Sequence, residues 1–140
     1  VSRAFMKVLV TAADGFVGAH LVRELESHGH QCILATHSNP EVSIDGSIRK
    51  AIPADIRSEQ ACKQMILSSQ PDAVIHLAGL SNVVAAAKNL VTLSETNVIG
   101  VHNLCVALER YAERAAVMLV ASSAFVYGNK WVGRQLISEQ

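Results

Sequence analysis

A glycine-containing turn within residues 7–18, which read KVLVTAADGFVG, is the stretch of this sequence best suited to bind an anion. Apolar residues 8–10 precede the turn, and the apolar positions of residues 16–27 after it recur with a helical period. This pattern predicts a strand, a tight loop and a helix. The free backbone N–H groups and the positive dipole end at the start of such a helix attract a phosphate or a pyrophosphate.

Two glycines determine how closely this turn can be approached. We expect Gly15 to let the backbone come near a ligand, and Gly18 to let the helix pack closely on the strand. A dinucleotide-binding turn normally carries three glycines, and its first position is Ala12 here. Ala12 fits that position only if its φ angle is negative. On this loop alone, a plain turn that packs a helix against a strand is the alternative interpretation.

The elements that would position this turn alternate between strands and helices. Apolar runs predict strands at residues 8–10, 32–36, 50–53, 73–77 and 116–121. Periodic stretches predict helices at residues 16–27, 58–69 and 91–114, and the turn-rich residues 38–46 predict a loop. Such alternation favours parallel pairing through right-handed crossovers. The predicted fold class is therefore α/β, a Rossmann-like doubly wound parallel sheet of about five strands with helices on both faces.

Several details of the helices follow from single residues. Gly29 is expected just beyond the end of the first helix, and Ser58 is expected to be the N-cap of the second. The apolar face of the third helix is predicted to comprise Val98, Val101, Leu104, Cys105 and Leu108.

Small and polar residues follow each predicted strand. The carboxyl ends of parallel strands meet at one edge of the sheet, and ligands of doubly wound folds bind there. The alternative is that these residues simply mark where loops begin. They are residues 11–15, 36–37, Asp55, 76–79 and 122–123.

The composition argues against several other classes of protein. The 140 residues are enough for one domain with a core, half of them are apolar, and the formal net charge is zero. No basic excess indicates nucleic-acid binding, no apolar run is long enough for a membrane span, and no GK[ST] follows the first loop. Cys32, Cys62 and Cys105 lack metal-ligand spacing and fit buried thiols in a reducing, cytoplasmic setting, so we expect no metal site.

Five motifs in sequence order resemble the extended short-chain dehydrogenase/reductases, the NAD(P)-dependent group of nucleotide-sugar epimerases, dehydratases and reductases. They are VTAADGFVG (10–18), ADIR (54–57), PDAVIHLAG (71–79), NVIGVHNL (97–104) and SSAFVYG (122–128). Their order and spacing agree with the family over nearly the whole chain from Met6. The resemblance implies an NAD(P)-binding Rossmann domain at 6–128, preceded by a leader or upstream remnant at 1–5. Residues 129–140 would be a loop or tail that opens a further, C-terminal portion.

The resemblance also implies which residues contact the adenine and pyrophosphate groups of the cofactor. The turn residues Ala12, Gly15, Phe16 and Val17 would lie against the pyrophosphate. Asp55 would hydrogen-bond the adenine amino group, and Ile56 would pack on the ring. The alternative role for Asp55 is a charge at the N-terminus of the helix that Ser58 caps.

Other positions would surround the nicotinamide and the substrate. Leu77, Ala78, Gly79 and Ser81 would line the path to the nicotinamide, and Thr96 would face a cofactor ribose. Ser123 matches the catalytic Ser/Thr of the family, whose hydroxyl polarises a sugar C–O bond; a serine bonded only to the backbone is the alternative. We expect His76 to be a packed structural histidine and Asn97 to stabilise the site through side-chain hydrogen bonds.

The residues after the second strand bear on the choice of cofactor. Members of this family that use NAD usually place an acid there for the ribose 2′-hydroxyl. Thr36, His37 and Ser38 occupy the stretch here, so no carboxylate repels a 2′-phosphate and NADP is favoured over NAD. The alternative is a surface loop without cofactor preference.

The YxxxK pair that supplies the acid/base of the family does not occur in these 140 residues. Ala115 and Trp131 stand four residues after Tyr111 and Tyr127, where the family has Lys. We therefore interpret the chain as the cofactor-binding part of an epimerase, dehydratase or reductase acting on a nucleotide sugar. The alternative is a non-catalytic NAD(P)-binding module that senses redox state or regulates a partner. The apolar fifth strand would be a sheet edge that favours self-association.

We predict that these 140 residues alone show no turnover of a nucleotide sugar, because they supply no general acid/base of suitable pKa. The measurement is a coupled epimerase or dehydratase assay with NAD and NADP. Turnover above background would show that these residues supply an acid/base without a YxxxK pair, which would contradict our interpretation.

Overall fold

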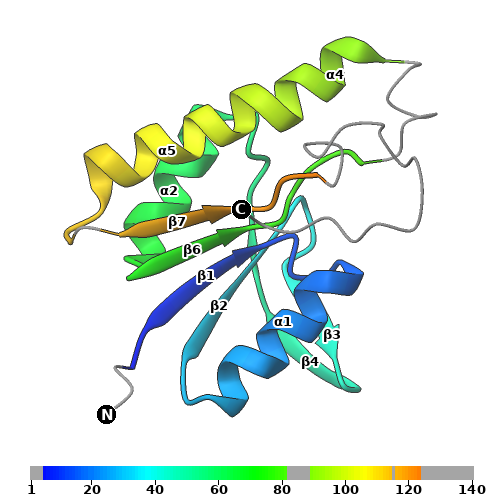
Figure 1. Ribbon diagram of the computed structural model, residues 1–140, viewed down its shortest axis with the longest axis vertical. Coiled ribbons are helices and arrows are strands. Elements are labelled where there is room, and N and C mark those ends of the chain that lie inside the picture. Colours follow the sequence, from blue (N-terminus) through cyan, green and yellow to red (C-terminus); the bar gives the residue numbers. More distant parts are fainter. Residues whose placement is uncertain (1–4, 82–88, 115, 124–140) are drawn as a thin grey trace, which may run out of the picture.

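A five-stranded parallel sheet forms the centre of the molecule. The computed structural model describes residues 5–81, 89–114 and 116–123. The order of the strands across the sheet is β5-β2-β1-β6-β7 (Figure 1), and all neighbours pair in parallel. This confirms the predicted fold class. The strands are β1 (Lys7–Thr11), β2 (Gln31–Thr36), β5 (Ile52–Pro53), β6 (Ala73–His76) and β7 (Val117–Val120).

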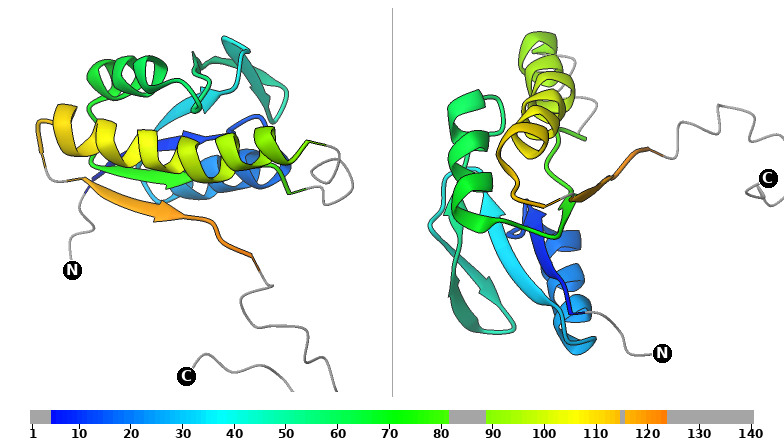
Figure 2. Two further views of the ribbon diagram at one scale, coloured as in Figure 1. Left: turned by 90° about the horizontal axis from the view of Figure 1, so that it is seen from above. Right: turned by 90° about the vertical axis from the view of Figure 1, so that its left-hand side faces the viewer.

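Helices cover both faces of the sheet (Figure 2). Helix α1 (Phe16–Ser27) lies on one face, and α2 (Glu59–Ser69) and α5 (Gly100–Tyr111) lie on the other. Residues of β1 alternate between the two cores, since Leu9 packs with residues of α2 and α5 while Val8 and Val10 pack with those of α1. A strand buried on both faces is apolar throughout, which is why the sequence predicts this one well.

Both predicted helix boundary residues are confirmed. The amide of Ala61 donates to Ser58 Oγ at 3.2 Å, so Ser58 caps α2. Gly29 follows α1 with a φ angle of +83°, and its amide donates to the carbonyl of Glu26.

The loop predicted at residues 38–46 is wrong, because a β-hairpin occupies most of it. Strands β3 (Glu41–Ile44) and β4 (Ser47–Lys50) pair antiparallel, and the strand predicted at 50–53 is reduced to β5. The turn residues Asp45 and Gly46 have φ angles of +52° and +75°, as the favoured two-residue hairpin turn requires. The hairpin is tied to α1 because Arg49 Nη1 contacts both carboxylate oxygens of Glu26, at 2.7 and 2.6 Å.

The single helix predicted at 91–114 is divided by a π-turn. The segment consists of α4 (Leu90–Ser94), the π-helix η1 (Glu95–Ile99) and α5. The amide of Gly100 donates to the carbonyl of Glu95, five residues earlier. The predicted apolar face is only partly correct: Leu104 and Leu108 are buried, but Val98 and Cys105 are exposed. The wider turn shifts Val98 out of phase with α5, whereas Cys105 lies beside the buried face within α5 itself. The prediction of three buried thiols holds for Cys62 alone, since Cys32 is half-buried and Cys105 is exposed.

Strand β7 lies at one edge of the described sheet. Its side chains Val117, Leu119 and Val120 are 69%, 55% and 43% exposed. Self-association through this edge stays a prediction. Among the described helices, none is long and apolar enough to cross a membrane.

The hydroxyl of Thr11 joins the carboxyl ends of β1 and β6. Its oxygen accepts hydrogen bonds from the amides of Leu77 (3.0 Å) and Ala78 (3.1 Å), and it lies 2.9 Å from His76 Nδ1. A hydroxyl has one proton and two acceptor positions. Because the two amides fill the acceptor positions, we infer that the proton goes to Nδ1.

His76 is consequently neutral, with its remaining proton on Nε2. The residue is only 2% exposed, as expected for a packed structural histidine, and Nε2 has no hydrogen-bond partner within the described ranges. Burial lowers the pKa of His76 because the charged form loses its hydration.

We predict that this histidine makes the stability depend on pH. In the unfolded chain His76 takes up a proton near pH 6.5, whereas in the folded chain it does so only at lower pH. The stabilisation that comes from keeping His76 neutral is complete above pH 6.5. It is lost as the pH falls from 6.5 toward the lower pKa of the folded chain, by at most about 1.4 kcal/mol per pH unit. Urea unfolding between pH 7.5 and 5.5 should show a shallower decline for His76→Asn than for the wild type. Equal slopes would contradict the inferred protonation state.

Candidate functional site

The first turn differs from the sequence-based expectation at Ala12. Its φ angle is +51°, in the left-handed region, so the expectation of a negative angle is wrong. Two hydrogen bonds hold this conformation: the Ala13 amide donates to the carbonyl of Ala35, and the Gly15 amide donates to the carbonyl of Ala12. An alanine therefore occupies a backbone position that glycine adopts more easily.

Close packing below the turn depends on Gly18. A Cβ built on Gly18 would lie 2.3 Å from the carbonyl oxygen of Ala12 and 2.8 Å from Ala13 Cα. Both contacts are with backbone, which side-chain movement cannot relieve. Glycine at this position thus allows α1 to begin directly against the end of β1.

Among the described residues, the amides at the start of α1 have no hydrogen-bond partner. Gly15 is an N-cap without a side-chain hydrogen bond, and no acidic residue stands in the first turn. The first helical bond runs from Ala19 to Gly15, and in the part of the chain that the structure describes no carbonyl accepts from the amides of Phe16, Val17 and Gly18. With the helix dipole, this end suits an anionic group.

A cavity of about 300 Å³ lies beside this turn, at the carboxyl ends of β1, β2, β5 and β6. Eight residues expected at the cofactor line it: Ala12, Thr36, His37, Asp55, Ile56, Ala78, Gly79 and Thr96. Five others do not line it: Gly15, Phe16, Val17, Leu77 and Ser81. Lining residues that sequence reasoning did not assign include Thr11, Asp14, Arg57, Leu80 and Thr92.

The side chains of Phe16 and Val17 are directed to the surface. They are 82% and 59% exposed, and Val17 borders a separate hollow along α1 with His20 and Leu21. A contact of these two residues with a cofactor would therefore involve their backbone amides.

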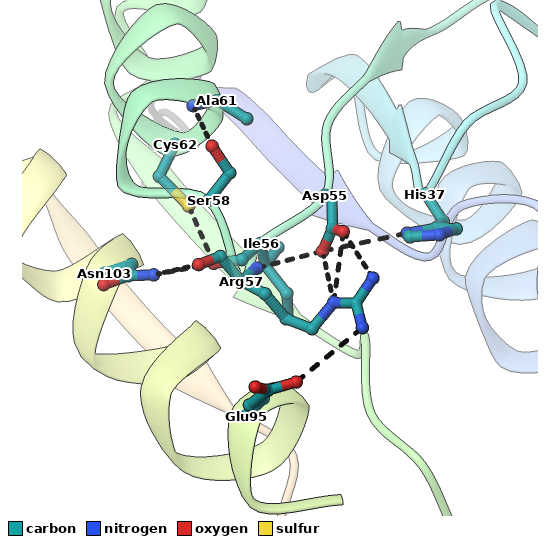
Figure 3. Close-up of polar contacts among 9 residues, drawn as sticks. All are labelled: His37, Asp55, Ile56, Arg57, Ser58, Ala61, Cys62, Glu95 and Asn103. Atoms are coloured by element: carbon teal, nitrogen blue, oxygen red, sulfur yellow. Dashed lines mark hydrogen bonds and ion pairs between the residues drawn. The ribbon is translucent and has the colours of Figure 1, made fainter. Parts of the chain in front are cut away.

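One end of the cavity carries a cluster of charged side chains (Figure 3). Arg57 holds the Asp55 carboxylate through Nε at 3.0 and 3.1 Å and through Nη2 at 2.6 Å. Its Nη1 lies 3.9 Å from Glu95 of η1, and His37 Nδ1 lies 3.9 Å from Asp55 Oδ1. The hydrogen bonds from Arg57 lower the pKa of Asp55, so this carboxylate stays ionised.

Thr36 does not offer its hydroxyl to a ligand. The residue is 2% exposed, and Oγ1 donates a hydrogen bond to the carbonyl of Asn39. The side chain that projects at the end of β2 is that of His37, which is 68% exposed.

Asn97 has the hydrogen-bonding role that the sequence predicts. Its Oδ1 accepts from the amide of Leu80 at 2.8 Å, and its Nδ2 donates to the carbonyl of the same residue at 3.0 Å. A Cβ on the neighbouring Gly79 would lie 3.2 Å from Asn97 Oδ1. The loop after β6 is thereby held against the helical segment that carries Thr96.

Ser123 follows β7 and is exposed. Tyr127 and the loop expected at 129–140 lie outside the described residues. Within the described ranges, no three His, Cys, Asp or Glu side chains gather as a metal site would require.

Relatives in sequence and structure are nucleotide-sugar enzymes. The UDP-glucose 4-epimerase of Bacillus subtilis (strain 168) is 30% identical over 131 residues, a match that covers 88% of this chain and 38% of the relative. A UDP-N-acetyl-alpha-D-glucosaminuronate decarboxylase of Bacillus cytotoxicus is 28% identical, covering 87% of this chain and 38% of the relative. The chain thus spans well under half the length of these curated relatives.

Solved structures of UDP-glucose 4-epimerases also resemble this chain. A UDP-glucose-4-epimerase from Stenotrophomonas maltophila with bound NAD and formylated UDP-arabinopyranose superimposes with a TM-score of 0.76 at 28% identity, over 89% of this chain and 39% of that one. The UDP-glucose 4-epimerase from Bifidobacterium longum in complex with NAD+ and UDP gives 0.72 at 26% identity, over 87% and 38%.

The family comparison covers almost the whole chain. Residues 8–137 match the NAD dependent epimerase/dehydratase family, which confirms the resemblance carried by the five motifs. This chain therefore belongs to the NAD-dependent epimerase/dehydratase family.

Proposed function

We propose that the cavity and the start of α1 bind NAD or NADP, and that this chain is the cofactor-binding part of a nucleotide-sugar epimerase or dehydratase. The observation that carries this proposal is the row of amides that find no acceptor in the described part of the chain, beside a cavity at the carboxyl edge of the sheet. The neighbours from S. maltophila and B. longum, which were crystallised with NAD, support it.

The residues present fit such a group. The amides of Phe16 and Val17 would hold the pyrophosphate after the turn at Gly15. Asp55 would accept a hydrogen bond from the adenine amino group, and Ile56, which is 6% exposed at the cavity wall, would pack on the ring. The nicotinamide would lie toward the part of the cavity that is bordered by the loop after β6 and by η1, at Ala78, Gly79 and Thr96. Leu77 and Ser81 are expected at the same end.

A nucleotide sugar is the substrate class we propose. The UDP-glucose 4-epimerases among the relatives support this choice. Ser123, at the end of β7, would donate its hydroxyl proton to a sugar oxygen and polarise the C–O bond. The cofactor, when bound, supplies a hydride acceptor and donor.

We further propose that the site favours NADP. No carboxylate stands at the end of β2, where His37 projects. Asp55, which follows the neighbouring strand β5, lies 3.9 Å from His37 Nδ1, and its charge is balanced by Arg57 through three side-chain contacts. A 2′-phosphate beside His37 would therefore meet a carboxylate whose charge Arg57 already offsets.

A cytoplasmic location completes the proposal. All three cysteines are free, and Cys105 is exposed. An exposed thiol is kept reduced most readily in a reducing compartment.

We predict that the 140-residue chain binds NAD or NADP in isothermal titration calorimetry and that Ala12→Gly binds at least as tightly. An alanine in the left-handed region costs about 1 kcal/mol relative to glycine, and Ala12→Gly relieves that cost. Ala12→Val, β-branched at the same φ, should weaken binding and lower the melting temperature.

The matched control is Ala19→Gly inside α1, where the same substitution should cost up to about 1 kcal/mol of stability. If neither NAD nor NADP gave a measurable heat of binding, the proposed function would be wrong. A lower melting temperature for Ala12→Gly than for the wild type would contradict the strain at Ala12.

We predict that His37→Asp reverses the cofactor preference. A carboxylate there repels a 2′-phosphate and can accept from the ribose 2′-hydroxyl, so the ratio of NADP to NAD affinity should fall at least about tenfold. His37→Asn, which adds no charge, is the control and should change the ratio by less than about threefold. Tighter binding of NAD than of NADP by the wild type would show that the preference is wrong.

A further inference from the structure

The peptide group between Ile56 and Arg57 is held from both sides (Figure 3). Its N–H, from Arg57, donates to Asp55 Oδ1 at 3.0 Å. Its carbonyl, from Ile56, accepts from Asn103 Nδ2 at 3.1 Å and from the Cys62 thiol at 3.3 Å. One rigid peptide plane therefore connects the amide of Asn103 on α5 to the carboxylate of Asp55 in the cavity wall.

The side-chain amide of Asn103 hydrogen-bonds only to this loop among the described residues. It is 8% exposed, and its Nδ2 donates both to the carbonyl of Ile56 and, at 2.9 Å, to the carbonyl of Arg57. An amide nitrogen carries two protons, so the two carbonyls use its whole donor capacity. Two consecutive peptide groups after β5 are thus fixed by one side chain that lies 46 residues further along the chain.

The approach of α5 to the loop requires Gly100, one helical turn before Asn103. A Cβ on Gly100 would lie 2.6 Å from Ile56 Cδ1 and 2.8 Å from Ile56 Cγ1. The absence of that atom lets the helix come close enough for Asn103 to reach the carbonyls. Packing against Gly100 and hydrogen bonding to Asn103 therefore act on the same loop, residues 54–58.

We infer that Asn103 is a positioning residue for adenine recognition, an inference that rests on the proposed function. It fixes the peptide plane whose N–H orients the Asp55 carboxylate. The Arg57 guanidinium also holds this carboxylate. Its own position depends on Asn103 as well, because Asn103 holds the backbone carbonyl of Arg57. Three protons already reach the Asp55 carboxylate, from the Arg57 amide, Nε and Nη2, and a carboxylate has about four acceptor positions, so one position remains for an adenine amino group.

A ratio of affinities separates positioning from a general structural role. Nicotinamide hypoxanthine dinucleotide differs from NAD in having an oxygen acceptor in place of the 6-amino donor. That oxygen would face the ionised Asp55, so the ratio of the two dissociation constants reports the placement of the carboxylate. A general loss of stability or of pyrophosphate binding weakens both ligands alike and leaves the ratio unchanged.

The experiment is calorimetric titration of the 140-residue chain with both dinucleotides. The wild type should bind NAD at least about tenfold more tightly than the hypoxanthine analogue, since a hydrogen bond to a charged group is replaced by two opposed acceptors. Asn103→Leu, similar in size but without donors, should reduce that ratio below about threefold. Asn103→Ser retains one donor and a smaller side chain, and it serves if the leucine variant fails to fold.

The matched comparison is Asn97→Leu, which removes the equivalent clamp on the loop after β6 and should weaken both dinucleotides without changing their ratio. A wild-type ratio in a folded Asn103 variant would overturn the inference, and so would equal binding of the two dinucleotides by the wild type. Neither of these results touches the proposed function. That function fails separately, if the wild type binds neither dinucleotide.

Discussion

The rest of the site depends on the hydroxyl of Thr11, because this one group joins the two central strands where they end. It satisfies the amides of Leu77 and Ala78 and the ring nitrogen of His76. Without it, three polar groups beside the cavity would lose a partner, at about 1–3 kcal/mol for each one that is buried. The same hydrogen bonds fix the direction in which the loop after β6 leaves the sheet. Stability and site geometry therefore have a common source.

The opposite walls of the cavity are held in a comparable way. Asn97 clamps the loop after β6, and Asn103 clamps the loop after β5. Both asparagines belong to the helical segment that crosses the face of the sheet (Figure 1). These side-chain contacts satisfy backbone groups of Leu80, Ile56 and Arg57 in the two loops. A cavity built in this way is set before any ligand arrives, which lowers the entropy lost on binding.

Much of the fold could be predicted from local sequence. Runs such as Val8 to Val10 are apolar throughout because the sheet is covered on both faces, and the Ser58 cap is a property of adjacent residues. The hairpin also carries a local signal, Asp45-Gly46 between alternating apolar residues, which the surrounding polar residues obscure. Local sequence could not predict three features of the site: the φ angle of Ala12, the hydrogen bond of the Thr36 hydroxyl and the contact of Asn103 with the loop after β5. Each depends on contacts in the folded chain that a sequence pattern does not specify.

The π-turn has a consequence for how the sequence can vary in length. In a regular α-helix, residues six positions apart point about 120° away from each other. Asn97 and Asn103 are separated by that spacing, with part of η1 between them, and each must meet its own loop. Gain or loss of a single residue between them would rotate one asparagine by about 100° relative to the other. Apart from the two asparagines and Gly100, the segment can therefore change its residue types more freely than its residue count.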